Sequence, residues 1–210
     1  MAKRLCAILG ASGIVSQRLQ QRLANHPWFE LVAICGGPDT AGKPLSSIGW
    51  KLEQQRPTLA EITVLDLSNS KICKQLLELG VSIVFSAIPS EIAQDVEPML
   101  AESGFAVFSN ASAYRRVDGI PLVIAEINPQ HMEHFAVDGL PMACSTNCTL
   151  MPIAMPLAPL DRMLGIKSLT MRSEQALSGG GWRLLSDEKA LAGSVNPEIP
   201  DEARKTASEL

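Results

Sequence analysis

Short apolar runs alternate with stretches in which apolar residues recur at helical spacing. Residues 5–9 form an apolar run that ends at Gly10, and apolar positions at helical spacing follow over residues 14–23. A second apolar run covers residues 29–35. A strand, a helix and a strand in this order predict the βαβ unit from which parallel sheets are built.

The same alternation continues along the chain. The pattern predicts strands over residues 62–66, 81–87 and 106–110, and helices over residues 71–79 and 92–101. Residues 81–87 are almost continuously apolar, which is typical of a strand buried on both faces of a parallel sheet. We therefore expect an α/β fold with a Rossmann-like, doubly wound parallel sheet.

The pattern changes after residues 138–141. A cysteine-bearing turn comes next, followed by a helical stretch, an extended segment over residues 166–176 and a polar tail over residues 196–210. We predict a dinucleotide-binding domain over residues 1–140 and the start of a second, incomplete α+β domain over residues 141–210. A proline inside a helix costs about 3 kcal/mol, so the helix containing Pro152, Pro156 and Pro159 is expected to be short or kinked. The tail has few apolar anchors, and we expect it to be loosely held.

Composition narrows the class of protein. The chain has 210 residues, of which 46% are hydrophobic, and 18 basic against 22 acidic residues give a net charge of −4. This balance argues against a nucleic acid or an anionic membrane as a partner. No apolar stretch is long enough for a membrane helix or a signal peptide, so we expect a cytoplasmic protein. Five irregularly spaced cysteines predict neither a disulfide framework nor a metal site, and four of them are expected to be buried.

Residues 10–15 form a turn between the first predicted strand and the first predicted helix. A dinucleotide pyrophosphate can meet unpaired backbone N–H groups at such a turn, at the positive end of the helix. Gly10 permits a tight turn and Gly13 permits close approach, but Ser12 replaces the second glycine of the GxGxxG pattern. We predict that Gly10, Ser12, Gly13 and Ile14 bind a dinucleotide, with an ordinary strand-to-helix turn as the alternative.

The loop after the second predicted strand normally selects between NAD and NADP. Thr40 and Lys43 suit a 2′-phosphate, whereas Asp39 would repel one, so the residues leave the selection open. Residues 37–43 also match the first seven positions of a Walker loop. Pro44 stands where that loop needs a Ser or Thr, which excludes a nucleoside triphosphatase.

Cys148 is a candidate nucleophile. It lies between Asn147 and Thr149 at a predicted helix start, where the helix dipole favours a thiolate and backbone N–H groups can stabilise an oxyanion. A lone cysteine is nevertheless more often a packed core residue. A thiol usually needs a neighbouring base, and all the histidines precede it: His26, His131 and His134.

Several segments occur in the order typical of one enzyme family. They are Gly10 to Gly13, Phe85 to Ala87, Ser109 to Ser112, Ile120 to Pro129, Asn147 to Thr149 and Gln175 to Gly179. With these segments the chain resembles aspartate-semialdehyde dehydrogenases, nearest to the archaeal and fungal branch, from residue 1 to about residue 181. The resemblance implies a Rossmann cofactor domain, a catalytic domain that also forms a homodimer, and NADP as cofactor, with NAD possible.

The resemblance also implies roles for individual residues. Cys148 matches the nucleophile that attacks L-aspartate 4-semialdehyde, and Gln175 matches a residue that helps position the intermediate. After hydride transfer the resulting thioester is cleaved by phosphate to an acyl phosphate, and Asn110 and Arg115 match the phosphate and substrate side of the site. The remaining cofactor-binding positions implied are Thr40, Ser86, Ser178 and Gly179.

Family members continue for well over a hundred residues beyond the position of Leu210, through an arginine that binds the substrate carboxylate and a histidine that acts as acid and base. We therefore expect turnover far below that of longer relatives, since loss of a general acid or base costs about 10²- to 10⁴-fold. The region after residue 141 should expose apolar surface unless a second copy or another chain covers it. Candidates for that surface, or alternatively for core filling, are Met142, Met151, Met155 and Met163.

Two alternative functions are compatible with the same fold. In one, the thiol serves an NAD(P)-dependent reductase acting on an acyl-coenzyme A thioester or another acyl phosphate. In the other, the chain is a non-catalytic paralogue that binds a dinucleotide or supplies a dimerisation surface.

Overall fold

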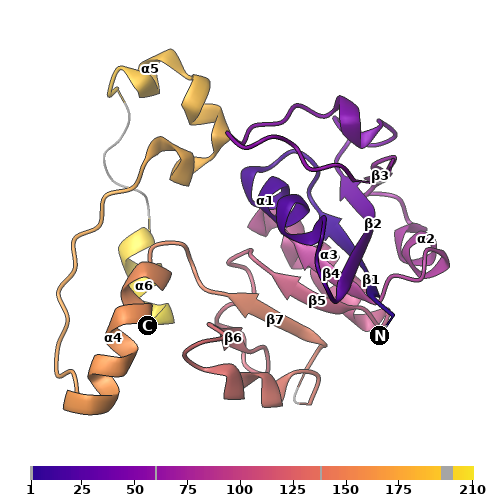
Figure 1. Cartoon of the computed structure of the whole chain (residues 1–210). Helices are drawn as coiled ribbons and strands as arrows, with labels where there is room; N and C mark the ends of the chain where they lie inside the picture. The colour runs from indigo at the N-terminus through magenta and orange to yellow at the C-terminus, as the bar shows by residue number, and fades with distance from the viewer. Residues whose placement is uncertain (1, 60, 138, 195–200) are drawn as a thin grey trace.

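A seven-stranded parallel sheet forms the centre of the molecule (Figure 1). The computed structural model describes residues 2–59, 61–137, 139–194 and 201–210. The strand order is β3-β2-β1-β4-β5-β7-β6, so the chain winds outward from β1 in both directions, as predicted for a doubly wound sheet. The strands are β1 (Arg4–Leu9), β2 (Phe29–Gly36), β3 (Leu65–Asp66), β4 (Ile83–Ser86), β5 (Ala106–Ser109), β6 (Leu122–Val123) and β7 (Met142–Ser145).

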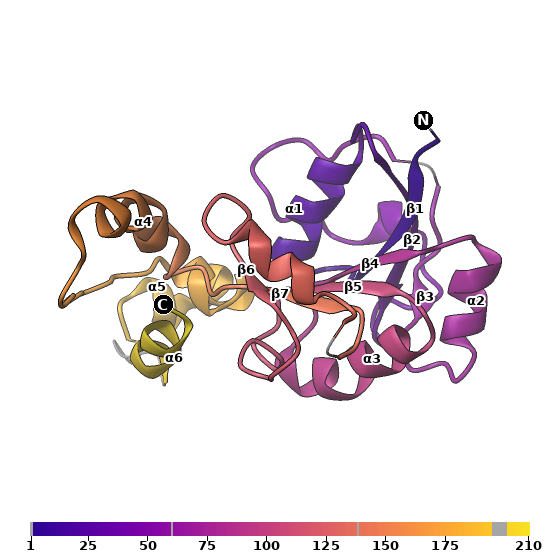
Figure 2. The ribbon, with the colours of Figure 1, turned by 90° about the horizontal axis from the view of Figure 1, so that it is seen from below.

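Helices cover both faces of this sheet. Helix α1 (Ile14–Leu23) lies on one face, and α2 (Ile72–Glu78) and α3 (Ser90–Glu102) lie on the other (Figure 2). Alternate residues of β1 enter the two cores. Ala7 and Leu9 pack in the cluster that contains residues of α2 and α3, and Cys6 and Ile8 pack in the cluster that contains Leu23 of α1. Every residue of β1 from Cys6 to Leu9 is therefore fully buried, which explains its unbroken apolar pattern.

The strand predicted over residues 62–66 is shorter than expected. Only Leu65 and Asp66 pair with β2. The preceding residues bond to the loop of residues 42–45 instead: Val64 N–H donates to the Lys43 carbonyl at 2.9 Å, and Thr63 forms an antiparallel bridge with Pro44. The buried side chains of Ile62 and Val64 produced the strand-like pattern without pairing in the sheet.

Strands β6 and β7 were not predicted. Each is very short, and β7 pairs with β5 on one side and β6 on the other. The sheet thus continues to Ser145, beyond the boundary predicted at residues 140 and 141. We propose that the boundary between the two parts of the chain lies after β7.

The proline-containing helix is longer than expected. Helix α4 (Met151–Leu164) runs for 14 residues, with Pro152 in its first turn and Pro156 and Pro159 inside it. Pro152 removes no bond, because the first N–H groups of a helix have no partner within the helix. The prediction of a short helix was therefore wrong.

The remaining chain forms short elements beside the sheet. Residues 165–176 are extended but pair with no strand among the described residues. They are followed by 3₁₀ turns and two helices, and none of the helices in the described parts of the chain is long and apolar enough to cross a membrane. These elements are η3 (Leu177–Gly180), η4 (Trp182–Ser186), α5 (Glu188–Leu191) and α6 (Glu202–Glu209), while η1 (Leu45–Ser47) and η2 (Pro129–His134) lie earlier.

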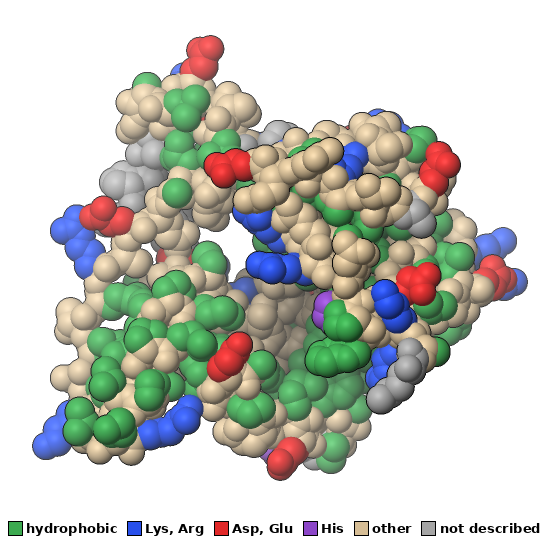
Figure 3. All heavy atoms as spheres, viewed as in Figure 1, with side chains coloured by type: hydrophobic (Ala, Val, Ile, Leu, Met, Phe, Trp, Pro, Cys, Tyr) green, Lys and Arg blue, Asp and Glu red, His purple; other side chains and the backbone are tan. Residues whose placement is uncertain are grey.

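Apolar side chains gather on the surface of α4 (Figure 3). Met142 is buried in β7, so it fills the core. Met151 and Met155 are each 40% exposed and Met163 is 78% exposed, which confirms the expected apolar surface for these three residues. Leu160 and Leu164 extend the same surface.

The carboxyl group of Glu97 is fully buried beneath the sheet. Ser109 Oγ donates to Glu97 Oε1 at 2.8 Å, yet burial raises the pKa of Glu97 above its ordinary value of 4.5. The folded state therefore binds this proton more tightly than the unfolded state. The stabilising contribution is complete below about pH 4.5 and is lost as pH rises through the raised pKa.

We expect Glu97→Gln to raise the melting temperature at pH 8, because an amide needs no charge and its NH₂ group can donate to the Ser86 hydroxyl, which lies within hydrogen-bond reach of the Glu97 side chain. The gain should shrink to nothing as pH falls towards 4. Thermal denaturation at both pH values checks this. An equal gain at both values, or none at pH 8, would contradict the assignment.

Candidate active site

The candidate residues lie at one edge of the sheet. Because all the strands are parallel, their carboxyl ends meet at this edge, where ligands bind in open α/β sheets. Five strands end there next to predicted site residues, at Leu9, Gly36, Ser86, Ser109 and Ser145.

The turn after β1 has the backbone geometry that was predicted. Gly10 has φ of +99°, and a Cβ atom on it would lie 2.8 Å from the Ala87 carbonyl oxygen. Gly13 caps α1 with an ordinary φ of −73°, and a Cβ there would meet no atom within 4 Å. Gly10 is thus required by the fold, whereas the space beside Gly13 and Ile14 at the start of α1 is open to a ligand.

A lysine that the sequence analysis missed lies against this turn. Lys51 Nζ donates to the Ser12 carbonyl at 2.5 Å, and its backbone N–H donates to Gln17 Oε1 at 2.8 Å. Gln17 is fully buried and also donates to the Gly49 carbonyl at 2.8 Å. Burial, and then the positive charge of Arg183, lower the pKa of Lys51. Two cationic groups therefore lie near the predicted pyrophosphate turn, an arrangement that favours an anion.

The loop after β2 approaches the same turn. A Cβ atom on Gly36 would overlap Thr40 Oγ1 and lie 3.3 Å from the Ala11 side chain. Thr40 therefore lies beside the turn, with its hydroxyl donating to the Gly37 carbonyl at 3.1 Å. Lys43, in contrast, donates to the Asp39 carbonyl at 2.7 Å on the surface.

Hydrogen bonds join the ends of β4, β5 and β7. The backbone N–H and the Nδ2 of Asn110 both donate to the Ser86 carbonyl at 3.0 Å. Ser145 Oγ donates to Asn110 Oδ1 at 3.0 Å. Two predicted residues, Ser86 and Asn110, are thus in direct contact.

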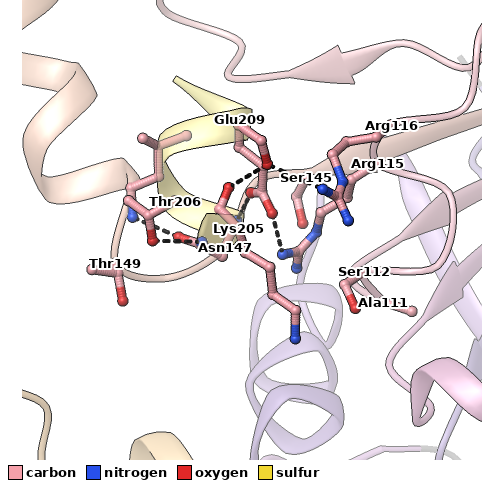
Figure 4. A network of polar contacts seen from close by, with 12 residues as sticks. Ala111, Ser112, Arg115, Arg116, Ser145, Asn147, Thr149, Lys205, Thr206 and Glu209 are labelled. Carbon is pink, nitrogen blue, oxygen red and sulfur yellow. Dashed lines mark hydrogen bonds and ion pairs between the residues drawn. The ribbon is translucent and has the colours of Figure 1, made fainter. Parts of the chain in front are cut away.

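Arg115 is held inside the protein by α6 (Figure 4). Its Nη1 lies 3.1 Å from Glu209 Oε1, and its Nη2 donates to the Asn110 carbonyl at 2.7 Å. The Arg115 and Glu209 side chains are 10% and 2% exposed. The other oxygen of Glu209 accepts from the backbone N–H of Asn147 at 2.7 Å. Glu209 thereby connects Arg115 to the residue that precedes Cys148.

Cys148 is exposed rather than packed in the core. It lies in a turn that ends at Leu150, and α4 begins at Met151, three residues later than a helix start at Cys148 would require. Burial raises the pKa of Cys6, Cys35 and Cys144 to about 12. These three thiols are buried as expected and Cys73 is half-buried, so Cys148 is the exposed thiol of the described chain.

Gln175 contacts Thr149, the residue that follows Cys148. Its Nε2 donates to Thr149 Oγ1 and to Glu202 Oε1, the latter at 3.1 Å. A Cβ atom on Gly179 would overlap Gln175 Oε1, so the 3₁₀ turn with Ser178 and Gly179 lies next to Gln175. Gln175 is therefore close to the loop that carries Cys148, and Ser178 is exposed on the surface.

His131 and His134 lie in η2, in a cavity that Arg115 of the candidate site also lines. His131 lies 2.9 Å from Asn128 Nδ2 in η2, through its Nδ1 atom. His131 and His134 line a cavity of about 470 Å³ together with Arg115, Arg116, Ser208 and the residues from Val117 to Leu122. Within the described chain, no cluster of His, Cys, Asp and Glu has the arrangement of a metal site.

The sequence analysis missed the part that α6 plays. The tail was expected to be loosely held, but residues 201–210 include α6, which contacts the Cys148 loop, and residues 196–200 lie outside the described chain. Glu202, Thr206 and Glu209 follow a spacing of i, i+4 and i+7, which places them on one helix face. This polar periodicity was the available signal, but without apolar residues it did not indicate an anchored helix.

Comparison with known proteins agrees with this fold. Residues 6–135 match the family model for the semialdehyde dehydrogenase NAD binding domain. An aspartate-semialdehyde dehydrogenase from Archaeoglobus fulgidus is 37% identical over 210 residues, covering 96% of this chain and 59% of that protein. One from Trichophyton rubrum is 31% identical, covering 99% and 58%. The chain therefore spans less than three fifths of these relatives.

Solved structures show the same architecture. Aspartate semialdehyde dehydrogenase with NADP from Candida albicans matches with a TM-score of 0.66 and 30% identity, covering 79% of this chain and 48% of that one. Aspartate semialdehyde dehydrogenase II from Vibrio cholerae matches with a TM-score of 0.73 over 95% of this chain and 55% of that one, at an identity of 20% that supports the fold alone. The matches in sequence establish that this chain belongs to the semialdehyde dehydrogenase family.

Proposed function

We propose that this chain carries out the cysteine chemistry of an NADP-dependent aspartate-semialdehyde dehydrogenase, with NAD as a second cofactor. The observation that carries the proposal is the exposed thiol of Cys148 at the same sheet edge as the Gly10 to Gly13 turn. The NADP complex of the Candida albicans relative supports the choice of cofactor.

The residues at the turn fit a dinucleotide. Open space beside Gly13, the N-terminus of α1 and the ammonium group of Lys51 are complementary to a pyrophosphate. Thr40 lies at the same turn, where its hydroxyl suits the ribose or its phosphate. Ser86 and the turn with Ser178 and Gly179 are assigned to the nicotinamide side. When bound, the cofactor accepts a hydride from the substrate carbon.

Cys148 supplies the nucleophile. As the thiolate, its sulfur attacks the aldehyde carbon of L-aspartate 4-semialdehyde, so that a C–S bond forms and the C=O π bond becomes an oxyanion, which re-forms the carbonyl when hydride leaves. Loss of hydride from that carbon leaves a thioester on Cys148. An oxygen of inorganic phosphate then attacks the thioester carbon, the C–S bond breaks, the thiolate leaves, and the 4-acyl phosphate is released. Gln175, whose Nε2 donates to Thr149 Oγ1 next to Cys148, is assigned to positioning the intermediate.

We propose that the inorganic phosphate binds on the side of the site where Asn110 and Arg115 lie. Two nitrogens of the Arg115 guanidinium already bond to Glu209 and Asn110. Arg115 also lines the cavity of about 470 Å³, so contact with phosphate is assigned to its guanidinium at this cavity.

We also propose a homodimer. The exposed apolar side chains on α4 favour contact with another protein surface, and a second copy of the chain would cover them. Light scattering measures the mass in solution, and a monomer at all concentrations would rule the homodimer out.

The reaction is tested by mixing the chain with the semialdehyde, NADP and phosphate and following absorbance at the NADPH band. We expect substrate-dependent NADPH formation and an acyl group on Cys148 when phosphate is omitted. The low turnover expected from the sequence stays a prediction that the same assay measures. No NADPH in the first turnover, with NADP shown to bind, would refute the proposed function.

A further inference from the structure

One buried carboxylate joins two separate parts of the candidate site. Glu209 is 2% exposed, and burial of a charge is costly unless partners compensate for it. It has two partners, one for each oxygen: Arg115 Nη1 at 3.1 Å and the backbone N–H of Asn147 at 2.7 Å (Figure 4). A charge-assisted bond to a backbone N–H is among the stronger hydrogen bonds in proteins. The carboxylate therefore fixes the peptide that precedes Cys148.

Three polar groups of Asn147 make hydrogen bonds: its backbone N–H, its Nδ2 and its Oδ1. Beyond the bond to Glu209, its Nδ2 donates to Thr206 Oγ1 at 3.1 Å, and its Oδ1 accepts from the backbone N–H of Leu150 at 2.7 Å. Two of these three contacts come from α6. The turn that presents the sulfur thus depends on α6 more than on α4, which follows it in the chain.

The other end of the connection lies on the sheet. Arg115 donates to the Asn110 carbonyl, and Asn110 bonds to Ser86 and accepts from Ser145. Glu209 therefore connects the Cys148 turn with the ends of β4, β5 and β7. A displacement of about 1 Å in a reacting group can cost about a hundredfold in rate, so such a connection has a large effect on chemistry.

We infer that Glu209 is a positioning residue, which sets the place of the Cys148 sulfur relative to Asn110 and Arg115 by holding the Asn147 backbone N–H and the Arg115 guanidinium together. The inference rests on the proposed function only for its effect on turnover. Its effect on the Cys148 turn is independent of catalysis.

The test is the rate at which each cysteine reacts with iodoacetamide in the whole chain, followed by mass spectrometry. In Glu209→Gln we expect Cys148 to react about threefold faster or more, because the loosened turn lets the already exposed sulfur adopt more of the orientations that alkylation requires. Cys6, Cys35 and Cys144 should stay as unreactive as in the unsubstituted chain. Turnover, where it is measurable, should fall about tenfold or more without a change in KM for NADP.

Asp201→Asn is the matched control. It removes one negative charge from the N-terminal end of the same helix, where Asp201 pairs with Arg204 at 3.3 Å on the surface, and asparagine tolerates the positive φ at this position. In Asp201→Asn, iodoacetamide should label Cys148 at the same rate as in the unsubstituted chain. Glu209→Asp keeps the carboxylate and should restore part of the original rate.

Unchanged reactivity of Cys148 in Glu209→Gln would overturn the inference. So would a general rise that includes the three buried thiols, because that result indicates a role in stability alone. If Glu209→Gln does not fold, Glu209→Asp replaces it, since its shorter side chain cannot span both Arg115 Nη1 and the Asn147 backbone N–H. A Cys148 rate in Glu209→Asp equal to that in Asp201→Asn would then refute the inference. Labelling needs no cofactor or substrate, so failure of the proposed reaction is separable from failure of this inference.

Discussion

Gly10→Ala is expected to destabilise the chain by about 3 kcal/mol. Two effects add at this position. A non-glycine residue at φ of +99° costs about 1 to 2 kcal/mol, and the new Cβ would lie 2.8 Å from the carbonyl oxygen of Ala87, the residue after β4, whose backbone N–H is bonded to the Leu9 carbonyl. Urea unfolding followed by circular dichroism measures the difference.

Gly13→Ala is the matched control, three residues further along the same turn. Its φ is −73° and nothing lies within 4 Å of the added Cβ, so the free energy of unfolding should stay within about 0.5 kcal/mol. Affinity for NADP should nevertheless fall, because the methyl group occupies the space assigned to the pyrophosphate. Equal destabilisation by both substitutions would contradict the geometry described for Gly10.

Cys148→Ser should reduce NADPH formation to background. The serine hydroxyl has a much higher pKa than a thiol and is a poor nucleophile without a neighbouring base. The residue is exposed, so the substitution should leave the free energy of unfolding within about 0.5 kcal/mol of the original value. NADPH absorbance in the first turnover and urea unfolding test the two parts.

Cys73→Ser serves as the control for this substitution. Cys73 is the half-buried thiol in the first turn of α2, where it packs against the core cluster that contains Ile72 and Leu76. Its variant should retain NADPH formation. A Cys148→Ser protein that forms NADPH from the semialdehyde would exclude Cys148 as the nucleophile.

The order of strands and helices through β5 could be predicted because each element follows its own hydrophobic period. Buried strands such as β1 need apolar residues on both faces, and α1 and α3 need them on one. Strands β6 and β7 could not be predicted, because two to four residues give no period. The boundary predicted at residues 140 and 141 did not take these two strands into account.

Some residues of the candidate site could likewise be predicted from the sequence, and others could not. Gly10 and Cys148 could be found from local patterns, since a turn and a thiol are properties of neighbouring residues. Lys51, Glu202 and Glu209 could not, because their contacts join residues between 39 and 94 positions apart. A helix such as α6, which is anchored by carboxylates rather than apolar side chains, has the sequence pattern of an exposed tail.

The central claim is that Cys148 and the Gly10 to Gly13 turn belong to one site. The direct measurement is the rate of iodoacetamide labelling of Cys148 with and without saturating NADP, with binding verified in the same sample. The account predicts that NADP slows labelling of Cys148, leaves Cys73 unchanged, and has no effect on Cys148 in a Gly13→Ala chain that does not bind it. A Cys148 rate that is the same in free and NADP-bound protein would contradict the account.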